Sequence, residues 1–396
     1  MSFVIFGDSF TFPEGNAATN RVHTYAKGFL ENGIKVHVIC FVNEYNTLGD
    51  NIINGIYFYH PFKQKKRSRY FIVRRWERLE KYANTVKLIR KINKSDKIIA
   101  VNCWTLLFST PLFAFFLAKY ARTKLISEHS EHPLRNYQGS VFREVRGKIK
   151  AYLEAMLCDG IFCISHYLIE FYEILGVRQK RLFLVPSTVD TERFRTFHSS
   201  PLPFQYILYC GGLTLVKDGV DILIKSFAGI SEKHPQIDLV LIGKGETEKT
   251  ELVLKELVNS LNINNRVHFL GQLSRTDVPA YLTNAKILAL ARPRSLVADA
   301  GFPSKLTEYL ASGIPVVVTE VGEIPVYLSD NINAFLAKPD SVEAFAGRLD
   351  FVLSNYEFAE DVAAKGQELT DTVFNYNYQA KRMLNFINSI SLNAKQ

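Results

Sequence analysis

The residues best suited to bind a ligand lie between Gly301 and Val317, in the run GFPSKLTEYLASGIPVV. Pro303 favours the first turn of a helix, and Gly313 favours the position just past its end. A helix N-terminus offers N–H groups and a partial positive charge, which suit a diphosphate. Glu308, one turn into this helix, could accept hydrogen bonds from two vicinal hydroxyls, such as those of a ribose. The alternative is an amphipathic helix with a solvated Glu308.

Two glycine-containing segments could also approach phosphate. Gly211 and Gly212 precede Lys217 in the run GGLTLVKDGVD, where a fixed cation would offset charge on a departing group. Gly15 and Asn16 precede a helical pattern, and a glycine there lets the backbone approach a ligand closely. Without further context, Lys217 is equally typical of a solvated lysine at a helix start, and Gly15 of an ordinary helix entry.

These residues need strands and helices to position them, and the chain predicts both. Short apolar runs alternate with helical patterns, which favours parallel α/β sheets. One series opens with a strand over 3–6, a helix over 17–32 and a strand over 35–41, and a second opens with a strand over 206–210. The run HSSPLP over 198–203 is a plausible linker between them. Flavodoxin-like and dehydrogenase folds show the same alternation, so the fold alone does not fix a function.

Composition describes an ordinary globular chain with an uneven charge. The chain has 396 residues, 47% of them hydrophobic and 22% charged, enough for two or three domains. Residues 1–200 hold 30 Lys and Arg against 17 Asp and Glu, a net +13, whereas the remainder carries −4. This asymmetry favours an anionic partner for the first half. Nucleic acid, anionic lipid and polyphosphate ligands all satisfy that requirement.

The positive charge is concentrated between Lys63 and Lys97, with 14 Lys and Arg against 3 acids. Aromatic residues, among them Tyr70, Phe71 and Trp76, are interspersed with it, a pattern typical of docking on anionic lipid. A solvated helix face with a loop is the plainer interpretation. No fold signature of a nucleic-acid-binding module is present, so we expect no nucleic acid partner.

Cysteine usage and apolar runs predict a cytosolic chain. The five cysteines are odd in number and form no CxxC pair, so we expect reduced thiols. The N-terminus lacks the basic region of a signal peptide. The apolar stretch 98–121 contains Asn102 and Pro111, and we expect it to form a buried strand and a helix rather than a membrane span.

The segment 301–317 resembles the donor-binding signature of family 4 retaining glycosyltransferases, in which a helix carries the second Glu of a Glu-x7-Glu motif. Glu308 matches that second Glu, which in the family binds the nucleotide ribose. The first Glu falls at Ala300, and the adjacent Asp299 is out of register. This departure concerns how the hydroxyls of the donor sugar are held.

The resemblance continues along most of the chain. The run 209–221 is similar to the family's Gly-Arg-Leu-x-x-x-Lys-Gly-Val-Asp motif, so Lys217 matches the lysine that stabilises the donor diphosphate, whereas Gly212 replaces the arginine. The run 185–194 resembles a segment near the domain crossing, which we interpret as mainly structural. A strand-end histidine is by itself more often structural, but the family places one beside the transferred sugar, at the position of His129.

The resemblance implies a GT-B architecture: an α/β fold of two Rossmann-like domains with the donor in the cleft between them. The implied domains are an acceptor-binding domain over 1–198, a nucleotide-sugar-binding domain over 204–372, and a helix over 373–396 that crosses back to the first. The implied catalytic residues are His129, Lys217 and Glu308. The implied donor-binding residues are Gly15, Asn16, Gly211, Gly212, Gly243, Leu270, Phe302, Pro303, Ser304, Lys305 and Leu306.

The implied reaction is retaining transfer of a hexose-type sugar from a UDP- or GDP-linked donor, without a metal or other cofactor. The expected acceptor is a saccharide linked to polyprenyl diphosphate, met at the inner face of the plasma membrane during the synthesis of a surface polysaccharide or glycan. A GT-B epimerase or phosphorylase would use the same fold. Ala300 and Gly212 also keep open a sugar-nucleotide-binding protein without catalysis.

Overall fold

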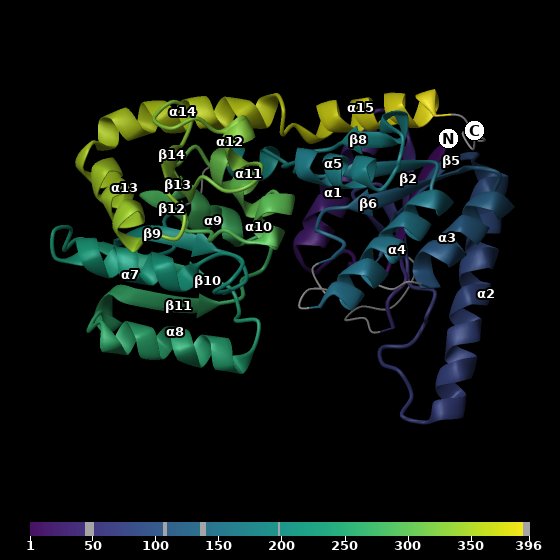
Figure 1. Cartoon of the computed structure of the whole chain (residues 1–396), viewed down its shortest axis with the longest axis horizontal. Coiled ribbons are helices and arrows are strands. Elements are labelled where there is room, and N and C mark those ends of the chain that lie inside the picture. The colour runs from purple at the N-terminus through teal and green to yellow at the C-terminus, as the bar shows by residue number, and fades with distance from the viewer. Residues whose placement is uncertain (44–50, 106–108, 135–139, 197–198, 391–396) are drawn as a thin grey trace. The chain divides into compact units, whose positions relative to one another are not determined.

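A computed structural model describes residues 1–43, 51–105, 109–134, 140–196 and 199–390. The chain forms two compact units. The N-terminal unit comprises Met1–Thr188 together with Tyr376–Gln396, and the C-terminal unit comprises Val189–Asn375 (Figure 1). Each unit has its own sheet with helices packed on it, wholly parallel in the C-terminal unit and parallel except for one strand pair in the N-terminal unit. Of the expected linker 198–203, residue 198 lies outside the described residues, and the others belong to the C-terminal unit.

The N-terminal unit is built on an eight-stranded sheet in the order β3-β4-β2-β1-β5-β6-β7-β8. All its pairings are parallel except that of β3 with β4. The strands are β1 (Ser2–Gly7), β2 (Lys35–Cys40), β3 (Asn51–Ile53), β4 (Ile56–Tyr59), β5 (Ile98–Trp104), β6 (Lys124–His129), β7 (Gly160–Cys163) and β8 (Leu182–Leu184). Strands buried on both faces are continuous apolar runs, as β1 shows.

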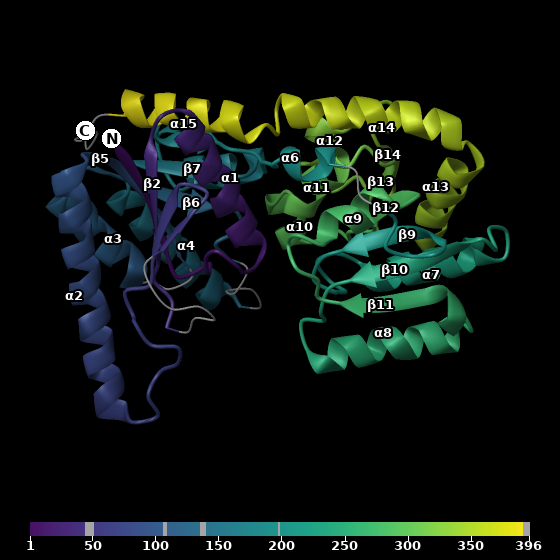
Figure 2. The ribbon, with the colours of Figure 1, turned by 180° about the vertical axis from the view of Figure 1, so that it is seen from behind.

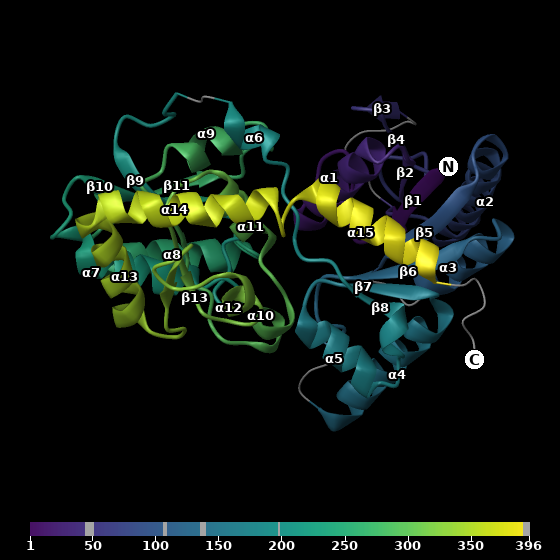
Figure 3. The same cartoon turned by 90° about the horizontal axis from the view of Figure 1, so that it is seen from above.

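Helices cover both faces of this sheet. Phe3 and Ile5 of β1 pack with α1 (Ala17–Glu31) and α15 (Tyr376–Ser389), whereas Val4 and Phe6 pack with α2 (Phe71–Ser95) and α3 (Ser109–Tyr120). Figures 2 and 3 show α15 lying beside α1 on the same face. The remaining helices of the unit are α4 (Val141–Leu157), which contacts α3, α5 (His166–Ile174) and the short η1 (Gln179–Arg181).

Close contact between α1 and α15 depends on a glycine. A Cβ atom on Gly28 would lie 2.6 Å from the Ala380 Cβ and 2.6 Å from the Tyr376 carbonyl oxygen. Tyr376 also donates a 2.6 Å hydrogen bond to Glu31 at the end of α1. The last helix of the chain is therefore part of the core of the N-terminal unit.

The C-terminal unit holds a six-stranded parallel sheet in the order β11-β10-β9-β12-β13-β14. Its strands are β9 (Gln205–Cys210), β10 (Ile237–Ile242), β11 (Val267–Gly271), β12 (Ile287–Leu290), β13 (Val316–Thr319) and β14 (Phe335–Ala337). Its helices are α6 (Glu192–Arg195), α7 (Val220–Ser231), α8 (Glu248–Ser260), η2 (Asn264–Arg266), α9 (Val278–Thr283), α10 (Leu296–Ala300), α11 (Ser304–Ala311), α12 (Ile324–Tyr327), α13 (Val342–Ser354) and α14 (Tyr356–Asp371).

The strand orders place a topological switch point in each sheet. In the C-terminal unit the chain moves outward from β9 through β10 to β11, then returns to β12 on the other side of β9 and moves outward again. In the N-terminal unit the corresponding point lies between β1 and β5. Open α/β sheets bind ligands outside the carboxyl ends of the strands at such points. We therefore expect a ligand-binding site at the loops after β9 and β12.

The apolar stretch 98–121 forms β5 and α3, as predicted from the sequence. Among the described residues, no helix is long and apolar enough to cross a membrane. None of the five cysteines forms a disulfide.

Candidate functional site

The residues of the predicted donor motif meet the glycine loop at the switch point of the C-terminal unit. From the first turn of α11, Lys305 donates hydrogen bonds to the Tyr209 hydroxyl (2.7 Å) and to Asp218 Oδ2 (2.8 Å). Tyr209 lies in β9, and its hydroxyl donates to the Gly212 carbonyl oxygen at 2.6 Å. A Cβ atom on Gly211 would lie 2.5 Å from Lys305 Nζ. The glycine at position 211 therefore leaves room for the lysine.

Three cations surround a single buried carboxylate in this cluster. The Asp218 side chain is 4% exposed and forms an ion pair with Lys305, and Arg292 and Lys217 also act on it electrostatically. Burial alone would raise the pKa of Asp218, but Lys305 and Arg292 bring this pKa below its usual value. Burial lowers the pKa of both Lys305 and Arg292. The cluster thus holds more positive than negative charge.

Two polar atoms in the cluster are buried without a hydrogen-bond partner among the described residues, Oδ1 of Asp218 and Nε of Arg292. Arg292 follows β12 and is 2% exposed, and its Nη2 donates to the Val297 carbonyl oxygen at 3.1 Å. Buried polar atoms normally have partners, because leaving one unsatisfied costs about 1–3 kcal/mol. Such atoms are common where a ligand completes a site.

Glu308 already has a partner within the C-terminal unit. Its Oε1 accepts a 2.5 Å hydrogen bond from Arg193 of α6, and Arg193 also donates to the Arg275 carbonyl oxygen at 2.8 Å. Burial beside the Arg193 guanidinium lowers the pKa of Arg275 to about 10. No described residue donates to Glu308 Oε2. Arg193 therefore fixes the carboxylate while one oxygen can still meet a ligand.

The other predicted donor residues flank this cluster. Gly243 follows β10 with φ +140°, and a Cβ there would lie 1.8 Å from the Gly211 carbonyl oxygen, so position 243 needs glycine. Leu270 lies in β11, next to β10. Pro303 is the N-cap of α11 and supplies no side-chain hydrogen bond, and in the first turn the Leu306 N–H donates to the Pro303 carbonyl oxygen at 2.9 Å. Phe302 is buried against Tyr327 and Phe374, whereas Ser304 begins the helix and Leu306 is in the core.

His129 lies in the N-terminal unit, at the carboxyl end of β6. Its ring nitrogens are within hydrogen-bond distance of Ser127 Oγ (2.9 Å) and of the Tyr172 hydroxyl (3.0 and 3.1 Å). Burial lowers the pKa of His129 to about 4, and it lowers the pKa of His132 to the same value. His129 is therefore neutral near pH 7 and can both donate and accept one hydrogen bond.

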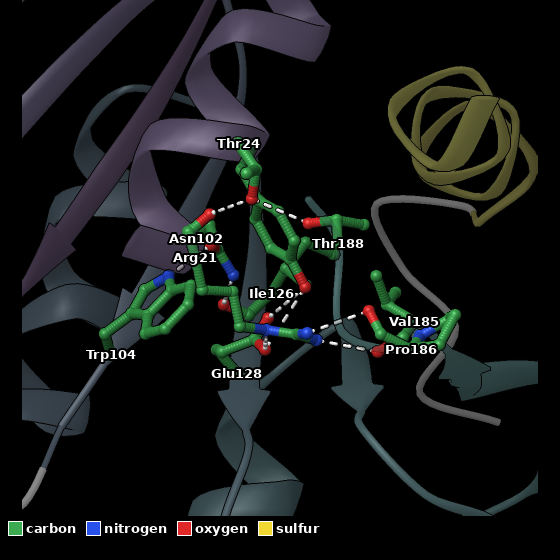
Figure 4. Close-up of polar contacts among 10 residues, drawn as sticks. Arg21, Thr24, Asn102, Trp104, Ile126, Glu128, Val185, Pro186 and Thr188 are labelled. Atoms are coloured by element: carbon green, nitrogen blue, oxygen red, sulfur yellow. Dashed lines mark hydrogen bonds and ion pairs between the residues drawn. The ribbon is translucent and has the colours of Figure 1, made fainter. Parts of the chain in front are cut away.

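A buried ion pair holds the strand end that carries His129. Arg21 of α1 donates from Nε to Glu128 Oε1 at 2.9 Å, and both side chains are almost fully buried. The two Nη atoms of Arg21 donate to the carbonyl oxygens of Pro186 and Val185 at 2.8 and 2.7 Å (Figure 4). Glu128 also accepts from the Tyr25 hydroxyl at 3.3 Å. Helix α1, strand β6 and the last segment before the C-terminal unit are thereby tied together.

Gly15 and Asn16 lie in the loop before α1. Asn16 is the N-cap of that helix, and its side chain accepts from the N–H groups of Ala18 (3.0 Å) and Thr19 (3.3 Å). A Cβ on Gly15 would lie 2.2 Å from the Thr19 hydroxyl. These two residues shape the helix entry: Asn16 caps the helix, and Gly15 leaves room for the Thr19 and Thr11 hydroxyls.

The structure thus gathers the predicted donor residues of the C-terminal unit around one switch point, except Leu270, which lies on the edge strand β11, whereas His129, Gly15 and Asn16 belong to the other unit. Sequence reasoning assigned no role to Tyr209, Asp218, Arg292 or Arg193. The first three are spread over β9, the loop after it and the loop after β12, so only the fold brings them together. Among the described residues, no group of three or more His, Cys, Asp or Glu side chains could hold a metal ion.

Two family models match the chain, and similar proteins are known. The family model Glycosyltransferase Family 4 matches residues 18–193, and Glycosyl transferases group 1 matches residues 190–369. An uncharacterized glycosyltransferase of Haemophilus influenzae is 24% identical over 295 residues, covering 73% of this chain and 76% of that protein. A GDP-mannose-dependent alpha-(1-6)-phosphatidylinositol monomannoside mannosyltransferase of Mycobacterium tuberculosis is 24% identical over 213 residues, covering 51% of this chain and 54% of that protein.

Among solved structures, Anabaena HepE in complex with UDP-glucose superposes with a TM-score of 0.70 at 16% identity, covering 97% of this chain and all of that one. Sucrose-phosphate synthase of Thermosynechococcus elongatus gives a TM-score of 0.74 at 15% identity, with 98% of both chains covered. The predicted GT-B architecture is confirmed. The two family models together span nearly the whole chain, which belongs to glycosyltransferase family 4 and is a transferase of the GT-B fold.

Proposed function

We propose that this enzyme transfers a hexose-type sugar from a UDP- or GDP-linked donor to a saccharide acceptor, with the C-terminal unit binding the donor. The observation that carries the proposal is the cluster at the switch point, where Lys305, Lys217 and Arg292 surround the carboxylate of Asp218. Asp299, which acts electrostatically on Arg292, is a second carboxylate beside these cations, so three cations face two anions and the cluster keeps a positive surplus. The diphosphate of a nucleotide sugar is negatively charged, and this surplus would attract it.

The donor would be held by groups from two sides of the cluster. Lys217 and Lys305 would contact the diphosphate together with the N–H groups of the first turn of α11, because a helix N-terminus attracts anions. Lys305 would supply the second cation that Gly212 removes from the motif. Glu308, fixed by Arg193, would accept from the ribose. The backbone near Leu270 would contact the base.

Both nucleotides remain within the proposal. The mycobacterial relative is named for GDP-mannose, and the Anabaena protein was solved with UDP-glucose. The other donor residues, Gly15, Asn16, Gly211, Gly243, Phe302, Pro303, Ser304 and Leu306, would shape the loops around the donor.

Transfer would retain the anomeric configuration. The acceptor hydroxyl would attack the anomeric carbon from the face on which the diphosphate leaves. The new C–O bond would form as the old one breaks, and a diphosphate oxygen would take the acceptor proton. Lys217 would stabilise the negative charge that develops on the departing diphosphate as the anomeric C–O bond breaks, without a metal or other cofactor. His129, neutral near pH 7, would donate a hydrogen bond to the transferred sugar rather than act as a charged acid.

The proposed acceptor is a saccharide linked to polyprenyl diphosphate, as in surface polysaccharide or glycan synthesis, met at the inner face of the plasma membrane. Support comes from the segment 63–78, which leads into the first two turns of α2. Tyr70, Phe71 and Trp76 there are 59, 62 and 69% exposed, and Arg74 and Arg75 lie among them. The mycobacterial relative, too, is named for a lipid acceptor.

The proposal is tested by looking for the product. A thermal-shift screen of sugar nucleotides first identifies the donor, because a ligand of the folded state raises the melting temperature. That donor is then incubated with polyprenyl-diphosphate saccharides, and mass spectrometry should find an acceptor one hexose heavier, with the donor's anomeric configuration by proton NMR. An epimerised donor or a sugar phosphate instead would identify an epimerase or phosphorylase. Nucleotide binding without any product would identify a binding protein.

A further inference from the structure

Helix α4 presents a second surface that the sequence motifs did not reveal. Its outward side is apolar along its whole length: Val141 and Phe142 are 79 and 78% exposed, and Ile149 is 54% exposed. The complete exposed apolar set is Val141, Phe142, Val145, Ile149, Tyr152, Leu153 and Met156. The opposite side, with Gly147, Ala151, Glu154 and Ala155, is buried. These seven positions repeat with helical spacing and form one stripe.

Cations border the stripe. Arg143, Arg146 and Lys148 are exposed, and Glu144 is the one exposed acid between Val141 and Leu157. By the turn of an α-helix, Arg146 lies along one edge of the stripe and Lys148 along the other. Apolar residues with flanking Lys and Arg are what a helix lying in the plane of an anionic bilayer requires. A second copy of this chain would instead bring like charges together across a symmetric interface.

The position of α4 relates this surface to the site. Helix α4 follows β6, so its first turn lies at the carboxyl edge of the sheet, where His129 ends that strand. Helix α2 follows β4, which is parallel to the other central strands, so the exposed aromatics at its start project from the same edge. Figure 1 shows both helices beginning on the same side of the N-terminal unit.

We propose that α4 is a lipid-docking helix: its apolar stripe inserts into the interfacial layer of an anionic phospholipid bilayer, with the start of α2 as a second contact. The acceptor is then an amphiphile that reaches the edge of the N-terminal sheet along the membrane surface. The statement about the acceptor rests on the proposed function, whereas the docking of α4 does not.

Docking is measured by flotation of the full chain with phosphatidylcholine vesicles, with and without phosphatidylglycerol. The stripe variant Phe142→Ser/Val145→Ser/Ile149→Ser should partition at least about tenfold more weakly than the wild type on anionic vesicles. The matched control, Ile174→Ser/Leu252→Ser/Ile332→Ser, removes three exposed apolar residues elsewhere and should bind normally. Equal binding by the stripe variant and the control would overturn the proposal.

A fluorescent probe reports insertion without weakening the surface. The chain has two tryptophans, of which Trp104 is buried and Trp76 exposed. The variant Trp76→Phe therefore keeps only the buried tryptophan, whose fluorescence should not respond to lipid. In that background Phe142→Trp should shift to the blue and be quenched by brominated lipid on anionic vesicles, whereas Ile174→Trp should not. An unquenched Phe142→Trp would contradict insertion. A wild type that is dimeric without lipid, together with a stripe variant that is monomeric, would also contradict it, because the stripe would then be an interface between two copies.

Nucleotide binding separates this inference from the proposed function. The stripe variant should bind UDP or GDP as tightly as the wild type, because α4 lies in the N-terminal unit. If the wild type binds vesicles through α4 but binds no nucleotide, the proposed donor site is wrong and the docking proposal stands. If the wild type binds nucleotide but the Phe142→Trp probe stays in water, the docking proposal is wrong and the donor site stands.

Discussion

At the scale of single residues, the candidate site depends on groups that satisfy one another until a ligand arrives. Lys305 is held by Tyr209 and Asp218, and Glu308 is held by Arg193. Such partners keep buried charges paired and fix side chains in place, which reduces the ordering that a donor must impose. Lys305 therefore combines a structural role with the proposed role in diphosphate binding, and variants can separate the two.

Lys305→Met should lower the free energy of unfolding by about 3 kcal/mol, because it leaves Asp218 buried without its ion-pair partner. We expect the wild type to bind UDP or GDP more tightly than UMP or GMP. Adding Asp218→Asn to Lys305→Met should restore much of the stability but not this preference for the diphosphate. Denaturant titration and calorimetry measure the two effects, with the exposed Lys225→Met as control. A double variant that regains the wild-type preference would show that Lys305 is only structural.

A second residue-scale prediction concerns acid stability. The pKa of both His129 and His132 is lowered from 6.5 to about 4 by burial, so the unfolded chain binds protons that the folded chain does not. The free energy of unfolding should therefore be fully developed above about pH 6.5 and fall as the pH decreases toward 4.

His132→Asn should reduce this pH slope, because an amide oxygen can replace the ring nitrogen that accepts from the Leu134 N–H and does not titrate. The exposed His166→Asn serves as the control. Denaturant titrations between pH 7 and pH 4.5 measure the slope. An unchanged slope in His132→Asn would place the acid sensitivity elsewhere.

The candidate site residues that the sequence predicts lie within continuous motifs, and their role stays a prediction. Glu308 and Lys305 lie in a single helix, and Lys217 follows a recognisable glycine pair. Sequence reasoning missed the role of Arg193, because the pairing with Glu308 joins α6 to α11 across 115 positions of sequence. It also missed Arg292, whose burial beside Asp218 depends on β9 and β12 being neighbours in the sheet. The spacing of residues along the chain does not indicate such contacts.

At the scale of elements, the sequence predicted strands and helices well where apolar periodicity was strong. The expected helix over 17–32 is α1, ending at Glu31, and the expected strand over 35–41 is β2, ending at Cys40. The exposed stripe of α4 was not foreseen, because an outward apolar face and an inward one give the same periodicity. Only the packing of Gly147 and Ala151 against the unit shows which side faces solvent.

The contact between α1 and α15 gives an element-scale prediction. Gly28→Ala should destabilise the chain by at least about 1 kcal/mol, because its Cβ would collide with Ala380 and the Tyr376 backbone. Gly347→Ala is the matched control: this glycine lies inside α13 with nothing within 4 Å of the added Cβ. There the same change should stabilise by about 0.5–1 kcal/mol. Thermal and denaturant unfolding would show opposite signs, and equal effects would argue against a tight α1–α15 contact.

At the scale of the whole molecule, the two units carry different properties of the chain. The N-terminal unit carries the basic segment 63–78, the α4 stripe and His129, whereas the C-terminal unit carries the cation cluster and Glu308. The surplus positive charge of the first half thus coincides with exposed aromatic and aliphatic side chains, a combination that the proposed membrane docking needs. The GT-B fold was predictable from the motifs, but the layout of surfaces was not.

The central claim is that the C-terminal unit binds a nucleoside diphosphate through the cluster around α11. The most direct test is calorimetric titration of UDP and GDP into the wild type, Glu308→Ala and the control Glu256→Ala, an exposed glutamate of α8. One nucleotide should bind saturably to the wild type and the control. Glu308→Ala, folded as judged by circular dichroism, should bind it roughly tenfold to a hundredfold more weakly, since a charge-assisted hydrogen bond is lost. Failure of both nucleotides to bind, or equal affinity in all three proteins, would contradict the account.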